Sequence, residues 1–197
     1  MPAKPFIIGL TGAMGMGKSQ TARLFAAEGI PVFDADAVVH GLYAAPGPLA
    51  RAIEEEFPGA VTSAGIDRAA LSAAMTPQKL KKLEALIHPA VAAARERFLE
   101  ENCLAPMVLF DIPLLLETGV AVDAVVVASA PAHVQKARVL ERPGMTAEKF
   151  AALAARQLSD AEKRAQAHYV VMTDQGLDHA REQVKMILAD IRVKLSA

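Results

Sequence analysis

The chain has 197 residues, a formal net charge of −1 and only 5% aromatic residues, which favours one domain with a sizeable core and argues against a nucleic-acid partner. No apolar run is long enough to cross a bilayer, and the run at residues 6–10 is too short for a signal peptide. The single cysteine, Cys103, excludes an intrachain disulfide or a thiolate metal cluster, so the composition predicts a cytoplasmic protein that binds neither nucleic acid nor membrane.

The N-terminal apolar run at residues 6–10 predicts a buried strand, and a helical pattern follows from residue 19 to about residue 28. The segment between them fits the phosphate-loop pattern G-x-x-x-x-G-K-[ST] without a mismatch. Glycines let backbone N–H groups turn toward phosphate oxygens, and the N-terminus of the next helix adds partial positive charge. We expect Lys18 to reach the β- and γ-phosphates of ATP and the Ser19 hydroxyl to bind Mg²⁺. The expected nucleotide-binding residues are Gly12, Ala13, Met14, Gly15, Met16, Gly17, Lys18, Ser19 and Gln20.

Residues 30–33 predict a short second strand, and Asp34 and Asp36 follow it directly. In a parallel sheet, ligands bind beyond the carboxyl ends of the strands. An aspartate at that edge can accept the proton of a substrate hydroxyl as the hydroxyl attacks the γ-phosphate. We therefore predict Asp36 as the substrate-facing carboxylate and Asp34 as its structural neighbour. Turn or helix-cap chemistry is the alternative for both.

Only helices are predicted between residues 38 and 102, which we interpret as an inserted substrate-binding subdomain. The His88-Pro89 dipeptide is expected to interrupt the longest helical pattern. His88 is a candidate ligand or switch residue, and a capping or packing role is the alternative. The expected helices cover residues 38–45, 49–57, 66–75, 77 to about 86, and a last stretch that ends near 102. Pro46-Gly47-Pro48 is expected to break the first of them, and Asp67 to start the third.

Residues 107–111 form an apolar run that ends in Asp111, which is typical of a buried parallel strand. Because the chain also carries a phosphate loop, we interpret Asp111 as a Walker-B-like carboxylate that holds Mg²⁺ directly or through water. A strand-end cap is the alternative. The apolar run that follows includes Leu114 and Leu115, and we expect it to line a substrate pocket or to pack against the inserted subdomain.

Five strands alternate with helices, because apolar runs at residues 122–128 and 169–172 predict two more strands. The fold class is therefore α/β, a three-layer α/β/α P-loop NTPase fold with a five-stranded parallel sheet. Residues 1–197 would form one domain, with the helical insertion at 38–102 and a helical lid at 138–167. The other expected helices cover residues 131–142, 146 to about 157, 160–167 and 177–195.

Arginines in the lid are candidates for stabilising the charge that spreads over a transferring phosphate. Arg142 lies beside the turn signal Pro143-Gly144 and is preferred over Arg138 and Arg156. Lys163 and Arg164 are expected to be surface charges.

The motifs together favour a small-molecule kinase. A GTPase would need an Asn-Lys-x-Asp segment, and the only asparagine, Asn102, does not lie in one. The chain resembles the dephospho-coenzyme A kinases in several ordered blocks. These blocks are Gly9-Leu10-Thr11 with the phosphate loop, Asp34-Ala35-Asp36, Leu86-Ile87-His88-Pro89, Asp111-Ile112-Pro113-Leu114-Leu115-Leu116-Glu117, the pair Arg138 and Arg142, and Arg156-Gln157.

The resemblance implies transfer of the γ-phosphate of ATP, with Mg²⁺, to the ribose 3′-hydroxyl of dephospho-coenzyme A, the final step of coenzyme A synthesis. Asp36 would be the general base, and Lys18 and Arg142 would be the other catalytic residues. The insertion would hold the coenzyme A portion, and the lid arginines would close over ATP, with Arg142 as a further nucleotide-binding residue. ATP and dephospho-coenzyme A are the expected partners, and we expect a monomer or a weak homo-oligomer. The substrate-binding residues would be Asp36, His88, Asp111, Leu114 and Leu115.

The chain departs from the family pattern at Ala13, Met16 and Gln20, and in the block at residues 167–176, which lies near the adenine in related kinases. The first two are positions whose backbone binds phosphate, so activity is expected. Two alternatives remain. One is a kinase of the same fold that acts on another acceptor, such as a nucleoside monophosphate. The other is a nucleotide-binding protein without turnover, against which the intact loop and carboxylates argue.

Overall fold

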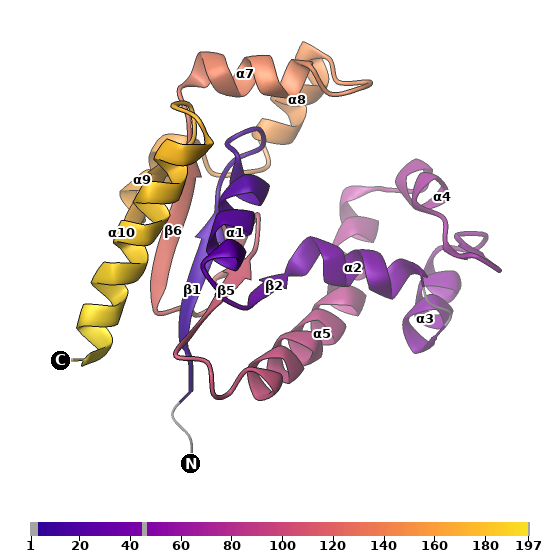
Figure 1. Ribbon diagram of the computed structural model, residues 1–197. Helices are drawn as coiled ribbons and strands as arrows, with labels where there is room; N and C mark the ends of the chain where they lie inside the picture. Colours follow the sequence, from indigo (N-terminus) through magenta and orange to yellow (C-terminus); the bar gives the residue numbers. More distant parts are fainter. Residues whose placement is uncertain (1–3, 45–46, 197) are drawn as a thin grey trace. The chain divides into compact units, whose positions relative to one another are not determined.

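The computed structural model describes residues 4–44 and 47–196 (Figure 1). The chain divides into two compact units. The first contains Met1–Phe33 and Asn102–Ala197, and the second contains Asp34–Glu101. The expected helix end at Ala45 and the expected break at Pro46 lie outside the described residues.

The first unit is built on a five-stranded parallel sheet with the strand order β2-β5-β1-β6-β7. Strand β1 is central, because it pairs in parallel with β5 on one side and with β6 on the other. Strands β5 and β6 are buried along their whole length, which explains their continuous apolar sequences. The strands are β1 (Phe6–Thr11), β2 (Val32–Asp34), β5 (Met107–Asp111), β6 (Ala124–Ser129) and β7 (Tyr169–Met172).

Helices cover both faces of this sheet, as the three-layer prediction requires. Alternate residues of β6 belong to different clusters: Val126 packs with the buried side of α1 (Lys18–Ala27) and α10 (Leu177–Ser196), whereas Val127 packs with Leu115 of α6 (Leu115–Thr118). Successive side chains of a strand point to opposite faces. The sheet is therefore enclosed between α1 and α10 on one face and α6 on the other, where α9 (Asp160–Ala165) also contacts β6.

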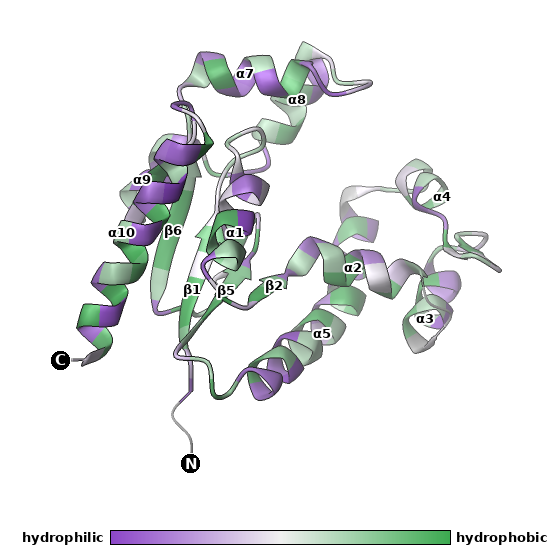
Figure 2. Ribbon diagram, in the orientation of Figure 1, coloured by the Kyte–Doolittle hydropathy of each residue, from purple (hydrophilic) through white to green (hydrophobic). Residues whose placement is uncertain are grey.

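Figure 2 shows this distribution as apolar strands in green between helices of mixed colour. Helix α10 has one buried face and one polar face, which is the pattern of an amphipathic helix packed on a sheet. Its buried residues are Ala180, Val184, Ile187, Leu188 and Ile191.

The segment predicted as a lid, residues 138–167, contains the C-terminal end of α7 (Ala132–Leu140) and the whole of α8 (Ala147–Ala154) and α9. The Thr146 side chain accepts a hydrogen bond from the Lys149 N–H and caps α8, as its sequence position predicts. A reciprocal capping box between Ser159 and Glu162 begins α9. These caps help to explain why two short helices begin at these positions.

The second unit, Asp34–Glu101, has a core of its own. Ile53 and Phe57 are its most deeply buried side chains, and Leu83 and Ile87 pack with them. Asp67 caps α4 by accepting hydrogen bonds from two backbone N–H groups, as predicted. The elements are α2 (Ala35–Ala44), α3 (Pro48–Glu56), β3 (Val61–Thr62), β4 (Gly65–Ile66), α4 (Arg68–Ala73) and α5 (Pro77–Glu101).

Two predictions for this second unit are wrong. The segment is not wholly helical, because β3 and β4 form an antiparallel hairpin whose turn is closed by a hydrogen bond from the Thr62 hydroxyl to the Gly65 carbonyl. Two-residue strands are too short to show a periodic pattern. Helix α5 also continues through Pro89 rather than stopping at it. Proline removes one helical hydrogen bond, and packing of Ile87 before Pro89 and of Val91 after it in the same core favours continuation.

The five predicted strands of the main sheet are all present, each within two residues of its expected ends. No helix among residues 4–44 and 47–196 combines the length and apolarity that a bilayer crossing requires.

Candidate active site

The phosphate loop connects the central strand β1 to helix α1 in the first unit. Gly15 and Gly17 have φ angles of 81° and 87°, in the left-handed region that favours glycine. A Cβ atom on Gly15 would lie 2.5 Å from the Cγ2 atom of Val139, and one on Gly17 would lie 2.9 Å from the Thr173 hydroxyl. Both glycines are therefore required by backbone conformation and by crowding.

Helix α1 begins directly after this loop, with Gly17 as its N-cap. In the described part of the chain no side chain caps this end, and the first turn holds no acidic residue. Such a helix terminus presents backbone N–H groups and a partial positive charge, which suits a phosphate anion. Ser19 lies in this turn with an exposed side chain, and Gln20 beside it is also exposed.

The loop lysine and the strand-end aspartate form an ion pair. The Lys18 Nζ atom lies 2.7 Å from the Asp111 Oδ1 atom, and the two side chains are 13% and 4% exposed. Sheet register explains the meeting, because Asp111 of β5 stands beside Leu10 of β1, just before the loop. The sequence predicted both residues at this edge of the sheet, and the structure brings them together.

Three side chains from later in the chain donate hydrogen bonds to carbonyl groups of the loop. Gln135 Nε2 donates to the Met14 carbonyl at 2.8 Å, and Arg138 Nη1 donates to the Gly15 carbonyl at 3.5 Å. The Thr173 hydroxyl donates to the Met16 carbonyl at 2.9 Å and accepts from Arg138 Nη1 at the same distance. These contacts hold the loop backbone in one orientation.

Arg138, rather than the preferred Arg142, is the lid arginine that contacts the loop. Arg138 also donates to the Thr173 carbonyl at 2.7 Å and so ties α7 to the segment after β7. Arg142 lies exposed just beyond the end of α7, and Arg156 is exposed as well.

Met16 has a role that the sequence did not reveal. Its side chain is 2% exposed, and its sulfur accepts a hydrogen bond from the Ala130 N–H at 3.2 Å. The loop pattern predicts a role for the backbone alone at this position. The buried side chain instead packs the loop against the end of β6.

The remaining predicted residues occupy varied environments. Asp34 accepts a hydrogen bond from the Ala37 N–H at 2.9 Å and so caps α2, and Asp36 is exposed in the first turn of that helix. His88 is exposed on α5. Leu114 is 37% exposed, whereas Leu115 is 1% exposed and packs on the sheet, so burial gives Leu115 a packing role.

The model of the family described as Dephospho-CoA kinase matches residues 6–179. The chain belongs to the dephospho-CoA kinase family. A dephospho-CoA kinase from Novosphingobium aromaticivorans is 50% identical over 195 residues, which cover 97% of this chain and 97% of that protein. One from Rhodopseudomonas palustris is 51% identical over 189 residues, with 93% and 94% covered.

Solved structures share the fold of this chain. TT1252 from Thermus thermophilus has a TM-score of 0.79 at 34% identity, with 95% of this chain and 98% of that chain covered. The dephospho-CoA kinase from Campylobacter jejuni has a TM-score of 0.65 at 20% identity, with 96% and 98% covered. Shikimate kinase from Acinetobacter baumannii, at 0.54 and 20% with 94% of each chain covered, shares the fold.

Dephospho-CoA kinases catalyse the final step of coenzyme A biosynthesis, the ATP-dependent phosphorylation of dephospho-CoA. The predicted phosphotransferase activity, its final place in coenzyme A synthesis and the P-loop kinase fold are thus confirmed. The chain is a kinase that uses ATP as a substrate.

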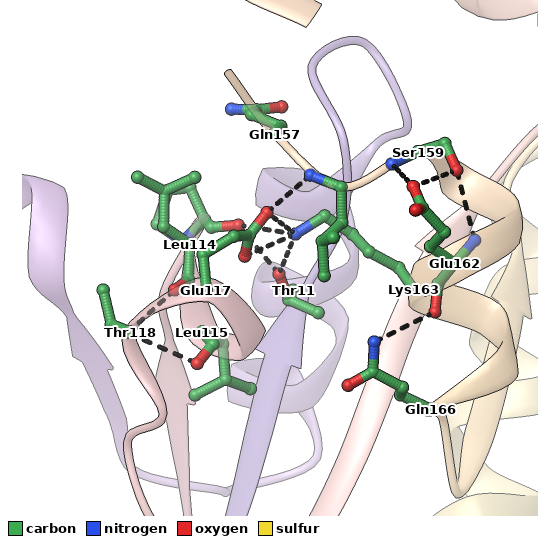
Figure 3. A network of polar contacts seen from close by, with 12 residues as sticks. Thr11, Leu114, Leu115, Glu117, Thr118, Gln157, Ser159, Glu162, Lys163 and Gln166 are labelled. Atoms are coloured by element: carbon green, nitrogen blue, oxygen red, sulfur yellow. Dashed lines mark hydrogen bonds and ion pairs between the residues drawn. The ribbon is translucent and has the colours of Figure 1, made fainter. Parts of the chain in front are cut away.

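One expectation about this dephospho-CoA kinase is wrong: Lys163 is not a surface charge. Its side chain is fully buried, and its Nζ atom lies 2.8 Å from the Glu117 Oε1 atom (Figure 3). Burial would raise the pKa of Glu117, but hydrogen bonds from Lys163 and the Leu158 N–H, with the Lys163 charge, outweigh it and lower the pKa. No local pattern marks a lysine in a short charged helix as buried, because its partner lies 46 residues away. Arg164 is exposed, as expected.

Proposed function

We propose that this chain transfers the γ-phosphate of ATP to the ribose 3′-hydroxyl of dephospho-CoA with the phosphate loop, Lys18, Asp111 and Asp36 as its principal groups. The observation that carries the proposal is the Lys18–Asp111 ion pair at the carboxyl ends of two neighbouring strands, beside the loop. The lysine would exchange this partner for the β- and γ-phosphates, where it stabilises the negative charge of the transferring group. Asp36, exposed at the start of α2, would accept the proton of the attacking hydroxyl.

The donor set at the loop fits Mg²⁺. The Ser19 hydroxyl and the Asp111 carboxylate are hard oxygen ligands, which Mg²⁺ prefers to nitrogen or sulfur. When bound with ATP, the ion would neutralise part of the phosphate charge. Ser19 and Asp111 would hold it directly or through water.

The second unit, Asp34–Glu101, is proposed to bind the coenzyme A portion of the acceptor. It has its own core, and it carries Asp36 and the exposed His88. Leu114, exposed beyond the carboxyl end of β5, is proposed as a further acceptor contact. Residues 138–167 are proposed as the lid, with Arg142 free to approach ATP when the segment closes.

The test is ADP release by the purified protein with Mg-ATP and each of four acceptors: dephospho-CoA, AMP, CMP and shikimate. We expect rapid release with dephospho-CoA alone and coenzyme A as the product, identified by mass. Release with another acceptor alone would retain the kinase mechanism but overturn the acceptor. Binding of ATP without release for any acceptor would favour the alternative of a nucleotide-binding protein without turnover.

A further inference from the structure

A buried lysine joins three chain segments that lead into the phosphate site. Lys163 of α9 is 0% exposed. Its ammonium donates to Glu117 Oε1 at 2.8 Å and Oε2 at 3.0 Å, to the Pro113 carbonyl at 3.2 Å and to the Thr11 hydroxyl at 3.3 Å (Figure 3). An ammonium has three protons, so these acceptors satisfy it fully.

Each acceptor lies next to a part of the phosphate site. Thr11 is the last residue of β1 and directly precedes Gly12 of the loop. Its hydroxyl also donates to the Pro113 carbonyl at 2.8 Å. Pro113 follows Asp111, the partner of Lys18, by two positions. The lysine therefore fixes the entrance of the loop against the segment that leaves β5.

Glu117, which pairs with Lys163, is also connected to the loop through residues 157 and 158. Glu117 Oε1 accepts a hydrogen bond from the Leu158 N–H at 2.9 Å. The preceding residue, Gln157, accepts the Met14 N–H of the loop at 3.4 Å through its Oε1 atom. The ion pair thus connects the entrance of the loop and its tip with residues 157–163 of the segment 138–167.

A fully buried lysine is a costly way to gain stability alone. Its desolvation opposes the attraction to Glu117, and apolar residues of similar size often replace such pairs without loss of stability. What an ion pair of this kind adds is a fixed geometry for the groups that it joins. Misplacement of reacting groups by about 1 Å can lower a rate by about 100-fold.

We propose that Lys163, paired with Glu117, is a positioning residue for phosphoryl transfer: it sets the geometry of the phosphate loop and of the Asp111 segment without touching substrate. The inference rests on the proposed function, because its test measures that reaction. The positioning role requires a loss of kcat with little change in KM, since the substrate contacts themselves remain.

The experiment compares Lys163→Met, Lys163→Arg, Glu117→Gln and the double variant Lys163→Met/Glu117→Met. Arg164→Met is the matched control, because Arg164 is the next cation on the same helix and is exposed. Thermal unfolding is recorded for each variant, and kcat and KM for ATP and dephospho-CoA are measured well below the lowest midpoint. Turnover by the wild-type protein tests the proposed function. The ratio of each variant's kcat to the wild-type kcat tests the positioning role.

We expect Lys163→Met to lower kcat by about 100-fold, Lys163→Arg to recover most of that loss, and Arg164→Met to match wild type. The double variant is decisive, because it removes both charges and should regain thermal stability while kcat stays low. Wild-type kcat in a folded double variant, or in folded Lys163→Met, would overturn the proposal. If neither lysine variant folds, Glu117→Gln decides: wild-type kcat refutes the positioning role, and a lowered kcat with unchanged KM supports it.

Discussion

Replacing Gly15 with alanine is expected to destabilise the protein more than the same replacement at Gly29. Both glycines have a φ angle of 81°. They differ in their surroundings, because a Cβ on Gly15 would lie 2.5 Å from Val139 Cγ2, whereas a Cβ on Gly29 would have no atom within 4 Å. The pair therefore separates backbone strain from crowding within one chain.

The expected magnitudes follow from these two contributions. Placing a non-glycine residue in the left-handed region costs about 1–2 kcal/mol, and this is the whole effect expected for Gly29→Ala. Forcing a methyl group into a packed site adds about 1–3 kcal/mol, so Gly15→Ala should cost about 2–5 kcal/mol. For a chain of this size, 1 kcal/mol corresponds to about 2–4 °C in Tm. The Tm should fall by about 2–8 °C at Gly29 and by about 4–20 °C at Gly15.

Urea and thermal unfolding followed by circular dichroism measure both variants, and Gly15→Ala/Val139→Ala completes the test. Removing the Val139 methyl groups should relieve the crowding. The double variant should therefore lose less free energy of unfolding than the two single variants lose together. Gly29→Ala should also retain turnover, because Gly29 lies beyond the far end of α1 from the loop. Equal destabilisation at the two glycines, or strict additivity in the double variant, would refute the reasoning from crowding.

Three further outcomes are expected. Asp36→Asn should lower kcat by about 10²–10⁴-fold with little change in ATP affinity, because it removes only the proton acceptor. Steady-state kinetics measure kcat, and equilibrium nucleotide binding measures the affinity. Wild-type turnover in this variant would exclude Asp36 as the base. Lys18→Ala should abolish measurable ADP release, and near-normal activity would undermine the role of the loop. Glu117 has a lowered pKa in the folded state, so its contribution to the free energy of unfolding is fully present above its ordinary value of 4.5 and is lost as the pH falls through the lowered value. Urea midpoints measured from about pH 6 downward should therefore fall less steeply in Glu117→Gln, and parallel curves would contradict this.

The sequence predicted the main sheet well because the signal for each strand is local. Strands β5 and β6 are buried on both faces, so every residue is apolar and the run is continuous. The hairpin of β3 and β4 gave no comparable signal, since each strand has only two residues. Helix α5 was not predicted as one element because proline is a local helix breaker, whereas its continuity depends on tertiary packing of Ile87 and Val91 on either side of Pro89.

The candidate site was predictable where a residue acts through a motif and unpredictable where it acts through distant partners. Lys18 and Asp111 follow from the loop pattern and from the end of a buried strand, and they do meet. Arg138 and Met16 contact groups more than 100 positions away, which a single sequence does not encode locally. The burial of Lys163 is of the same kind, because only the folded chain places Glu117 beside it.

The central position of β1 has a consequence for the order in which the protein is made. The phosphate loop is synthesised long before β5 and β6, because these strands, which pair with its own strand β1, follow more than 90 residues later. The side chains that bind the loop carbonyls come later still, at separations of 121, 123 and 157 positions. Contacts at such separations form late, because a long loop must close before they can contribute. A nascent chain therefore carries the nucleotide-binding motif long before it has a nucleotide-binding site, and a product truncated before Thr173 would carry the motif without the complete site.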